Sequence, residues 1–128
     1  MAPIAQLNLG LVRVQRGAWA EAIEVFEAAG DALSRQGRRA YLAAVHTGLL
    51  PCLASLNDLA EFDRQLELAE AAVAETGFAD PDLARLAEHG GDLVAGERAA
   101  RAWALAEDQW RRLGRESEER RVASKSSS

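Results

Sequence analysis

The sequence predicts an all-α fold, arranged as an α-solenoid of three antiparallel helix pairs. Among the 128 residues, Ala supplies 27 and Leu 17, whereas the β-branched residues Val, Ile and Thr total only 11. Ala and Leu favour helices, while strands are enriched in β-branched and aromatic residues. One pattern also occurs three times: a small or aromatic residue is followed four residues later by a large residue and three residues after that by an alanine. The three occurrences are separated by 40 and 37 residues. The three sets are Ala22-Phe26-Ala29, Phe62-Leu66-Ala69 and Ala99-Trp103-Ala106. Such a period indicates helix pairs that stack on one another.

Gly, Asn and Pro residues divide the chain into six predicted helices at 3–16, 18–36, 38–56, 58–76, 81–95 and 97–114. A short break at Gly17 follows the first helix. Gly37 follows the second helix and Gly77 the fourth, where glycine adopts the left-handed turn at no steric cost. Pro51 lies inside the third helix, so we expect a kink near His46 or a helix that restarts at Leu50.

The last three helices have similar end signals. Asn57 and Asp58 separate the third helix from the fourth, and Asp58 can cap the fourth. Gly77 ends the fourth helix, and the dipeptide Asp80-Pro81 provides a cap and a first turn for the fifth. Gly96 precedes the sixth helix. Residues 1–114 therefore form the predicted repeat domain, and the charged, Ser-rich residues 115–128 are expected to be a disordered tail.

Charge and composition argue against several functional classes. The chain has 15 basic and 20 acidic residues, a net charge of −5, which does not favour binding to nucleic acid. It has no run of 18 apolar residues that could span a membrane, and residues 1–6 lack the features of a signal peptide. Cys52 is the only cysteine, which excludes an intrachain disulfide and fits a cytoplasmic protein.

Few residues are candidates for chemistry. His46 and His89 occupy similar places in successive repeats, and Glu88 and Asp92 could add carboxylates to a metal site. Ordinary surface histidines are the favoured interpretation, because a catalytic metal site needs at least three converging ligands. Cys52 lies in an apolar stretch and is expected to be buried and inert. We therefore predict no enzymatic activity, no metal and no cofactor.

The first helix is unusually apolar. Ile4, Leu7, Leu11 and Val14 form one stripe at helical spacing, and other apolar residues lie on the opposite side. A terminal solenoid helix should carry a polar outer face. We therefore expect a partner surface to cover this stripe, either a second copy in a homodimer or further repeats upstream. The alternative is a groove lined by small apolar patches.

The first unit has a distinctive set of spaced residues, Leu9-Gly10, Gly17-Ala18-Trp19, Ala22, Phe26 and Ala29. In these positions it resembles a tetratricopeptide repeat. The second unit matches more loosely, with Phe62 in place of a small residue and Leu50 in place of the packing glycine. The third keeps Ala99, Trp103 and Ala106, with Gly91 as its small residue. Residues 96–114 are also similar to the C-terminal repeats of large bacterial serine/threonine kinases and ATPase-type regulators.

The resemblance implies a scaffold that binds a peptide or helix of a partner protein in the concave groove formed by the first helix of each pair. By helical spacing, the candidate groove residues are Ile4, Leu7, Leu11, Val14, Thr47, Arg85 and Glu88. A second hypothesis is a structural or dimerising segment of a larger bacterial signalling protein, with no ligand of its own.

Overall fold

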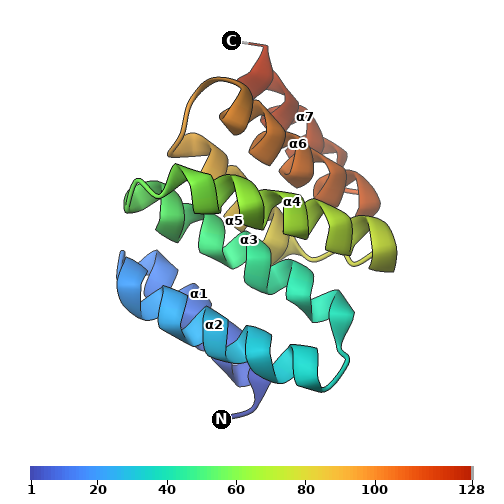
Figure 1. Cartoon of the computed structure of the whole chain (residues 1–128). Helices are drawn as coiled ribbons and strands as arrows, with labels where there is room; N and C mark the ends of the chain where they lie inside the picture. The colour runs from blue at the N-terminus through green and yellow to red at the C-terminus, as the bar shows by residue number, and fades with distance from the viewer. Residues whose placement is uncertain (128) are drawn as a thin grey trace.

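The computed structural model describes residues 1–127 and is all-α over that range, which confirms the predicted fold class. The helices are α1 (Pro3–Gln15), α2 (Trp19–Arg35), α3 (Arg39–Ser55), α4 (Leu59–Thr76), α5 (Pro81–Asp92), α6 (Gly96–Arg112) and α7 (Glu116–Ser126). The first six form the hairpins α1/α2, α3/α4 and α5/α6. The hairpins stack side by side, so that the two termini lie at opposite ends of the molecule (Figure 1).

Central helix α3 holds the stack together. It packs against α2, α4 and α5, and this explains why its buried apolar residues do not keep to one side of the helix. The helix continues unbroken through the buried Pro51, so the predicted restart at Leu50 is wrong. Gly37 and Gly77 adopt a positive φ of 67° and 71°, as predicted for left-handed helix ends, and the breaks at Gly17 and Asn57 adopt the same conformation.

Phe26 of α2 joins the first two hairpins. The side chain is 1% exposed, and it lies between two glycines of neighbouring helices. A Cβ atom built on Gly10 of α1 would be 2.5 Å from Cε1 of the ring, and one built on Gly48 of α3 would be 2.5 Å from Cζ. Because neither glycine has a side chain, α1, α2 and α3 can approach one another closely around the Phe26 ring. Phe26 and Leu66 are buried as the repeated spacing predicts.

The third repeat differs from the prediction. Trp103 is only partly buried, with its ring over Gly91 and its indole N–H donating to the Asp92 carboxylate at 3.0 Å. Trp110, two turns further along α6, is the fully buried tryptophan of this repeat. A polar partner at the edge of the hairpin keeps the Trp103 ring near the surface.

The predicted disordered tail is a seventh helix. Val122 of α7 is fully buried, and α7 packs against α6. Arg121 and Lys125 both form ion pairs with Glu88 of α5. The hydrogen bonds from Arg121 hold the pKa of Glu88 below its usual value. The helix therefore covers the C-terminal end of the stack, against α6 and the Glu88 side chain of α5. Ser128, the last residue of the predicted tail, lies outside the described residues.

Candidate functional site

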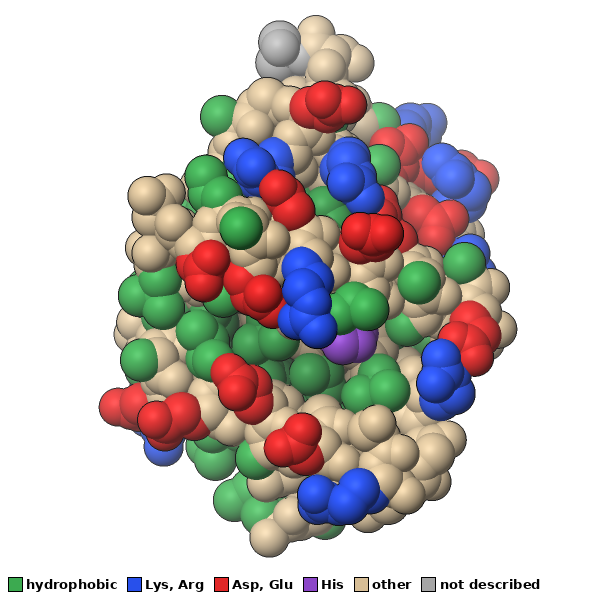
Figure 2. Space-filling model, viewed as in Figure 1, with side chains coloured by type: hydrophobic (Ala, Val, Ile, Leu, Met, Phe, Trp, Pro, Cys, Tyr) green, Lys and Arg blue, Asp and Glu red, His purple; other side chains and the backbone are tan. Residues whose placement is uncertain are grey.

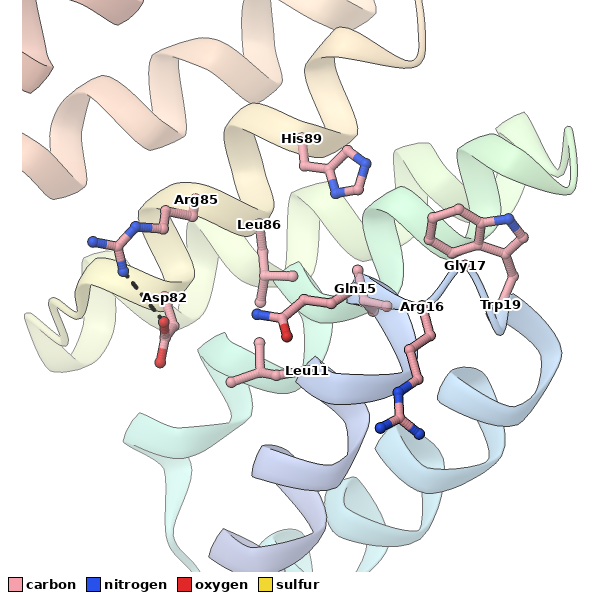
Figure 3. Close-up of a pocket in the computed structure, with 10 residues that line it drawn as sticks. Leu11, Gln15, Arg16, Gly17, Trp19, Asp82, Arg85, Leu86 and His89 are labelled. Carbon is pink, nitrogen blue, oxygen red and sulfur yellow. Dashed lines mark hydrogen bonds and ion pairs between the residues drawn. The ribbon is translucent and has the colours of Figure 1, made fainter.

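A groove runs between α1 and α5 along the row formed by the first helix of each hairpin. Its larger part is a cavity of about 470 Å³ bounded by the C-terminal half of α1, the first residue of α2 and one face of α5. Figure 3 shows the side chains of the two walls facing each other across this space. The residues that line it are Leu11, Val14, Gln15, Arg16, Gly17, Trp19, Asp82, Arg85, Leu86 and His89.

Local sequence explains how α5 presents its wall. The Asp80 carboxylate accepts a hydrogen bond from the backbone N–H of Asp82 at 2.8 Å, which caps the helix just before Pro81. Because α5 begins at Pro81, Asp82, Leu86 and His89 are spaced by four and three residues and lie on one face of the helix. The face looks across the groove toward α1 (Figure 3).

A smaller and more apolar pocket of about 130 Å³ adjoins the first and shares Leu11, Asp82 and Leu86 with it. The other residues that line it are Ile4, Leu7, Asn8, Phe26, Tyr41, Ala44, Phe78, Asp80 and Leu83. The Tyr41 and Phe78 rings pack with their centroids 5.6 Å apart.

The loop that carries Phe78 is held in place from α6. The side chain of Gln109 is fully buried, and its amide N–H donates a hydrogen bond to the Phe78 carbonyl at 2.9 Å. The Gln109 carbonyl accepts the backbone N–H of Asp80, also at 2.9 Å. A buried amide that satisfies two backbone groups fixes the loop. The aromatic wall of the smaller pocket is therefore preformed.

Charged and aromatic groups surround the larger cavity. Arg85 lies 3.4 Å from Asp82 and also stacks over the buried Trp110 ring, 5.6 Å from its centroid. His89 packs edge-on against Trp19, with the ring centroids 6.0 Å apart. Arg16 is exposed and forms no ion pair within the described chain. The groove thus combines an apolar floor with a polar rim, the usual composition of a binding site.

Five of the predicted groove residues line these two pockets, namely Ile4, Leu7, Leu11, Val14 and Arg85. The prediction is wrong for Thr47 and Glu88. Thr47 is fully buried, and its hydroxyl donates to the Ala43 carbonyl at 2.7 Å. Glu88 is buried against α7, where it pairs with Arg121 and Lys125. Both residues lie on helices that line the groove, but their side chains are turned into other contacts.

The apolar stripe of α1 is covered in part by the chain itself. Leu7 is 8% exposed and Val14 is 4% exposed, whereas Ile4 and Leu11 are half-buried. Leu7 and Val14 thus need no outside partner to be buried, and a homodimer or upstream repeats at Ile4 and Leu11 stay a prediction. The stripe is one wall of the groove, which corresponds to the alternative interpretation of the first helix.

Among the further residues that line the groove, helical spacing did not assign Trp19, Tyr41, Phe78, Leu86 and His89 to it. Leu86 and His89 could have been found, because they lie on the helix face that includes Arg85. Tyr41 and Phe78 gave no such signal, since they enter the groove only through the packing of α3 and of the loop before α5.

The other residues considered for chemistry lie apart from the groove or from one another. His46 contacts Gln65 of α4 at 2.7 Å, far in the fold from the pair formed by His89 and Trp19. Cys52 is buried as predicted, and burial raises the pKa of its thiol to about 12. Within residues 1–127, no three His, Cys, Asp or Glu side chains are placed to hold a metal ion together.

None of the described helices combines the length and the apolar character needed to cross a membrane. Comparisons with protein-family models, curated proteins and solved structures found no match to this chain.

Proposed function

We propose that this chain is a non-catalytic, tetratricopeptide-like interaction module, which binds a segment of a partner protein in the groove between α1 and α5. The observation that carries the proposal is the groove itself, a cavity of about 470 Å³ continuous with an aromatic pocket. Both walls are helices, so the site exists before the partner arrives, and little ordering cost opposes binding.

The composition of the groove favours a protein segment with an apolar face. Side chains such as Leu or Phe on the partner would enter the pocket formed by Tyr41, Phe78 and Leu83. Polar groups on the same segment would meet Arg16 and Asp82 at the rim. Apolar anchors in a central pocket with a polar rim are the usual arrangement at protein interfaces.

The ionisable groups outside the groove support a structural rather than a catalytic role. Glu88 and Asp63 are committed to ion pairs with arginines of neighbouring helices. The Cys52 thiol is kept protonated by burial and cannot act as a nucleophile near neutral pH. A buried, unoxidised thiol also fits a cytoplasmic location.

The proposal can be tested by selecting binders from a random peptide library displayed on phage. We expect the parent protein to enrich peptides with two or more apolar residues on one side. Leu11→Arg, which places a charge on the groove floor, should reduce the affinity of these peptides by at least about tenfold. Val12→Arg is the matched control, because the neighbouring Val12 side chain is exposed and does not line the groove.

Two results would contradict the proposal. One is enrichment of no peptide by the parent protein. The other is equal binding of the enriched peptides to Leu11→Arg and to the parent. Circular dichroism melts of both variants would show that the comparison is made on folded protein.

A second candidate function is that of a structural segment that joins further copies or further repeats. The exposed Val12 and the half-buried Leu9, one turn apart on α1, favour it. Sedimentation of the parent at high concentration tests the joining of further copies, which requires self-association that Val12→Arg reduces and Leu11→Arg leaves intact.

A further inference from the structure

A second groove lies between α2 and α4, on another face of α3. It consists of two adjoining hollows of about 330 and 270 Å³. Val45, Leu49 and Leu53 of α3 form its apolar floor. None of these three residues lines the groove described above, to which α3 contributes Tyr41 and Ala44 instead. Figure 2 shows this face of the molecule, with acidic side chains around a hollow that has hydrophobic side chains at its base.

The α2 wall carries acidic groups without partners. Glu27 lines both hollows, and Asp31 lines the larger one. Neither carboxylate forms an ion pair within the described chain, although most acidic residues of α4 and α6 do. Glu24 precedes Glu27 by three residues and is exposed on the same side of α2. The wall therefore presents negative charge next to apolar surface.

The α4 wall is held rigid by a chain of hydrogen bonds. His46 Nδ1 lies 2.7 Å from Gln65 Oε1, and since an amide oxygen only accepts, this nitrogen must carry a proton. Gln65 Nε2 then donates to Glu61 Oε1 at 2.9 Å. Arg64 donates to the same Glu61 oxygen at 2.7 Å, so the Glu61 charge is compensated. The free negative charge of the groove is consequently on α2.

We propose that the groove between α2 and α4 binds a basic amphipathic segment of a second partner protein. Apolar side chains of this segment would contact Leu49 and Val45, while Arg or Lys groups would pair with Glu27 and Asp31. The long aliphatic stems of Arg and Lys are suited to the apolar floor beside these carboxylates. This interaction is separate from the groove of α1 and α5, and both grooves can be occupied at once.

The negative charge of the α2 wall favours a basic protein segment over a second copy of this chain, anionic lipid or nucleic acid. A second copy of the chain has a net charge of −5 and would be repelled on average. Anionic lipid and nucleic acid carry the same sign as the Glu27 wall. A basic protein segment is the macromolecular partner whose charge complements the wall and whose side chains fill the floor.

The test uses three synthetic, rhodamine-labelled helical peptides of about 14 residues. One has Leu on one face flanked by Arg, the second has Glu in place of each Arg, and the third has Ser in place of each Leu. Binding is measured by fluorescence anisotropy at low and at physiological salt. We expect the Leu/Arg peptide to bind at least about tenfold more tightly than either control peptide, and more weakly as salt rises.

Two pairs of substitutions locate the site on the protein. Glu27→Gln with Asp31→Asn should weaken the Leu/Arg peptide by about fivefold or more. Glu97→Gln with Glu116→Gln makes the same change in net charge on α6 and α7, at exposed carboxylates away from the groove. This control should change the affinity by less than about twofold.

Three outcomes would overturn the proposal. The first is no binding of the Leu/Arg peptide at about 1 mM protein. The second is equal weakening by the two pairs of substitutions, which would mean that the peptide senses only the overall charge. The third is equal binding of the Ser-substituted peptide, which would exclude the apolar floor. In Leu11→Arg, which blocks the α1/α5 groove, the binding that depends on Glu27 and Asp31 should remain, so failure of one groove is distinguishable from failure of the other.

Discussion

Gly48→Ala should destabilise the protein in the presence of Phe26 and stabilise it in its absence. Alanine is a better helix former than glycine by about 0.8–1.0 kcal/mol in a helix interior such as that of α3. On local grounds alone the substitution is therefore favourable. The added Cβ, however, would lie 2.5 Å from the Phe26 ring, about 1 Å closer than ordinary carbon contact.

The Phe26 ring has no room to retreat. On its other side, a Cβ at Gly10 would also lie 2.5 Å away, and the ring itself is 1% exposed. Overpacking of this kind costs about 1–3 kcal/mol. After the gain in helix propensity, we expect Gly48→Ala to have a net cost of up to about 2 kcal/mol in the parent.

In a Phe26→Ala background the clash is gone and only the gain remains. Phe26→Ala alone should cost about 3–5 kcal/mol. Gly48→Ala added to it should restore up to about 1 kcal/mol, so the coupling energy of the pair equals the cost of the clash, about 1–3 kcal/mol. Phe26→Leu provides a milder background that keeps the chain folded for the same comparison.

The assay is urea denaturation followed by far-UV circular dichroism on the four proteins of the cycle. Gly91→Ala is the control, because its Cβ would meet Trp103 in the third hairpin and not Phe26. Its effect should be the same in both backgrounds. If Gly48→Ala costs the same with and without Phe26, the explanation of helix approach by paired glycines is wrong.

Four further predictions concern α7 and three side chains. Deleting residues 116–128 should lower the free energy of unfolding by at least about 1.5 kcal/mol in urea titrations, because it exposes the site of the fully buried Val122. The native pKa of Glu88 is lowered from 4.5, so its ion pairs contribute fully to stability above that value and this contribution is lost as pH falls through the lower native pKa. Hydrogen exchange of α7 should therefore accelerate in that pH range. Glu88→Gln should remove this dependence on pH. The buried Cys52 should react with a thiol reagent at pH 8 only when the protein unfolds. Trp103→Ala should lower the melting midpoint less than Trp110→Ala, since Trp103 is partly exposed.

Groove residues show where sequence reasoning succeeded and where it stopped. Helical spacing within α1 was enough to group Ile4, Leu7, Leu11 and Val14, because residues three and four apart share a face. The same reasoning failed for Thr47 and Glu88. Each belongs to a helix with neighbours on several sides, and spacing within the helix does not say which neighbour a given face meets.

What the sequence determined by itself is the local structure. Composition selects helices, and the turns at Gly17, Gly37, Asn57 and Gly77 follow from residues that accept a left-handed conformation or cap a helix. These preferences act within a few residues, so they can be recognised without knowledge of the rest of the chain. The repeated spacing then predicts which large residues, such as Phe26, enter the core.

Only the tertiary structure decided the placement of groups that are distant in sequence. α7 is a short, highly charged segment, and it docks by burying Val122 and by pairing Arg121 with Glu88, 33 residues earlier. The choice of Trp110 over Trp103 for the core, and the opening of grooves on two faces of α3, depend on how the hairpins cross. Contacts of this kind arise between surfaces that each helix forms independently, and their free energy exists only once the helices are packed together.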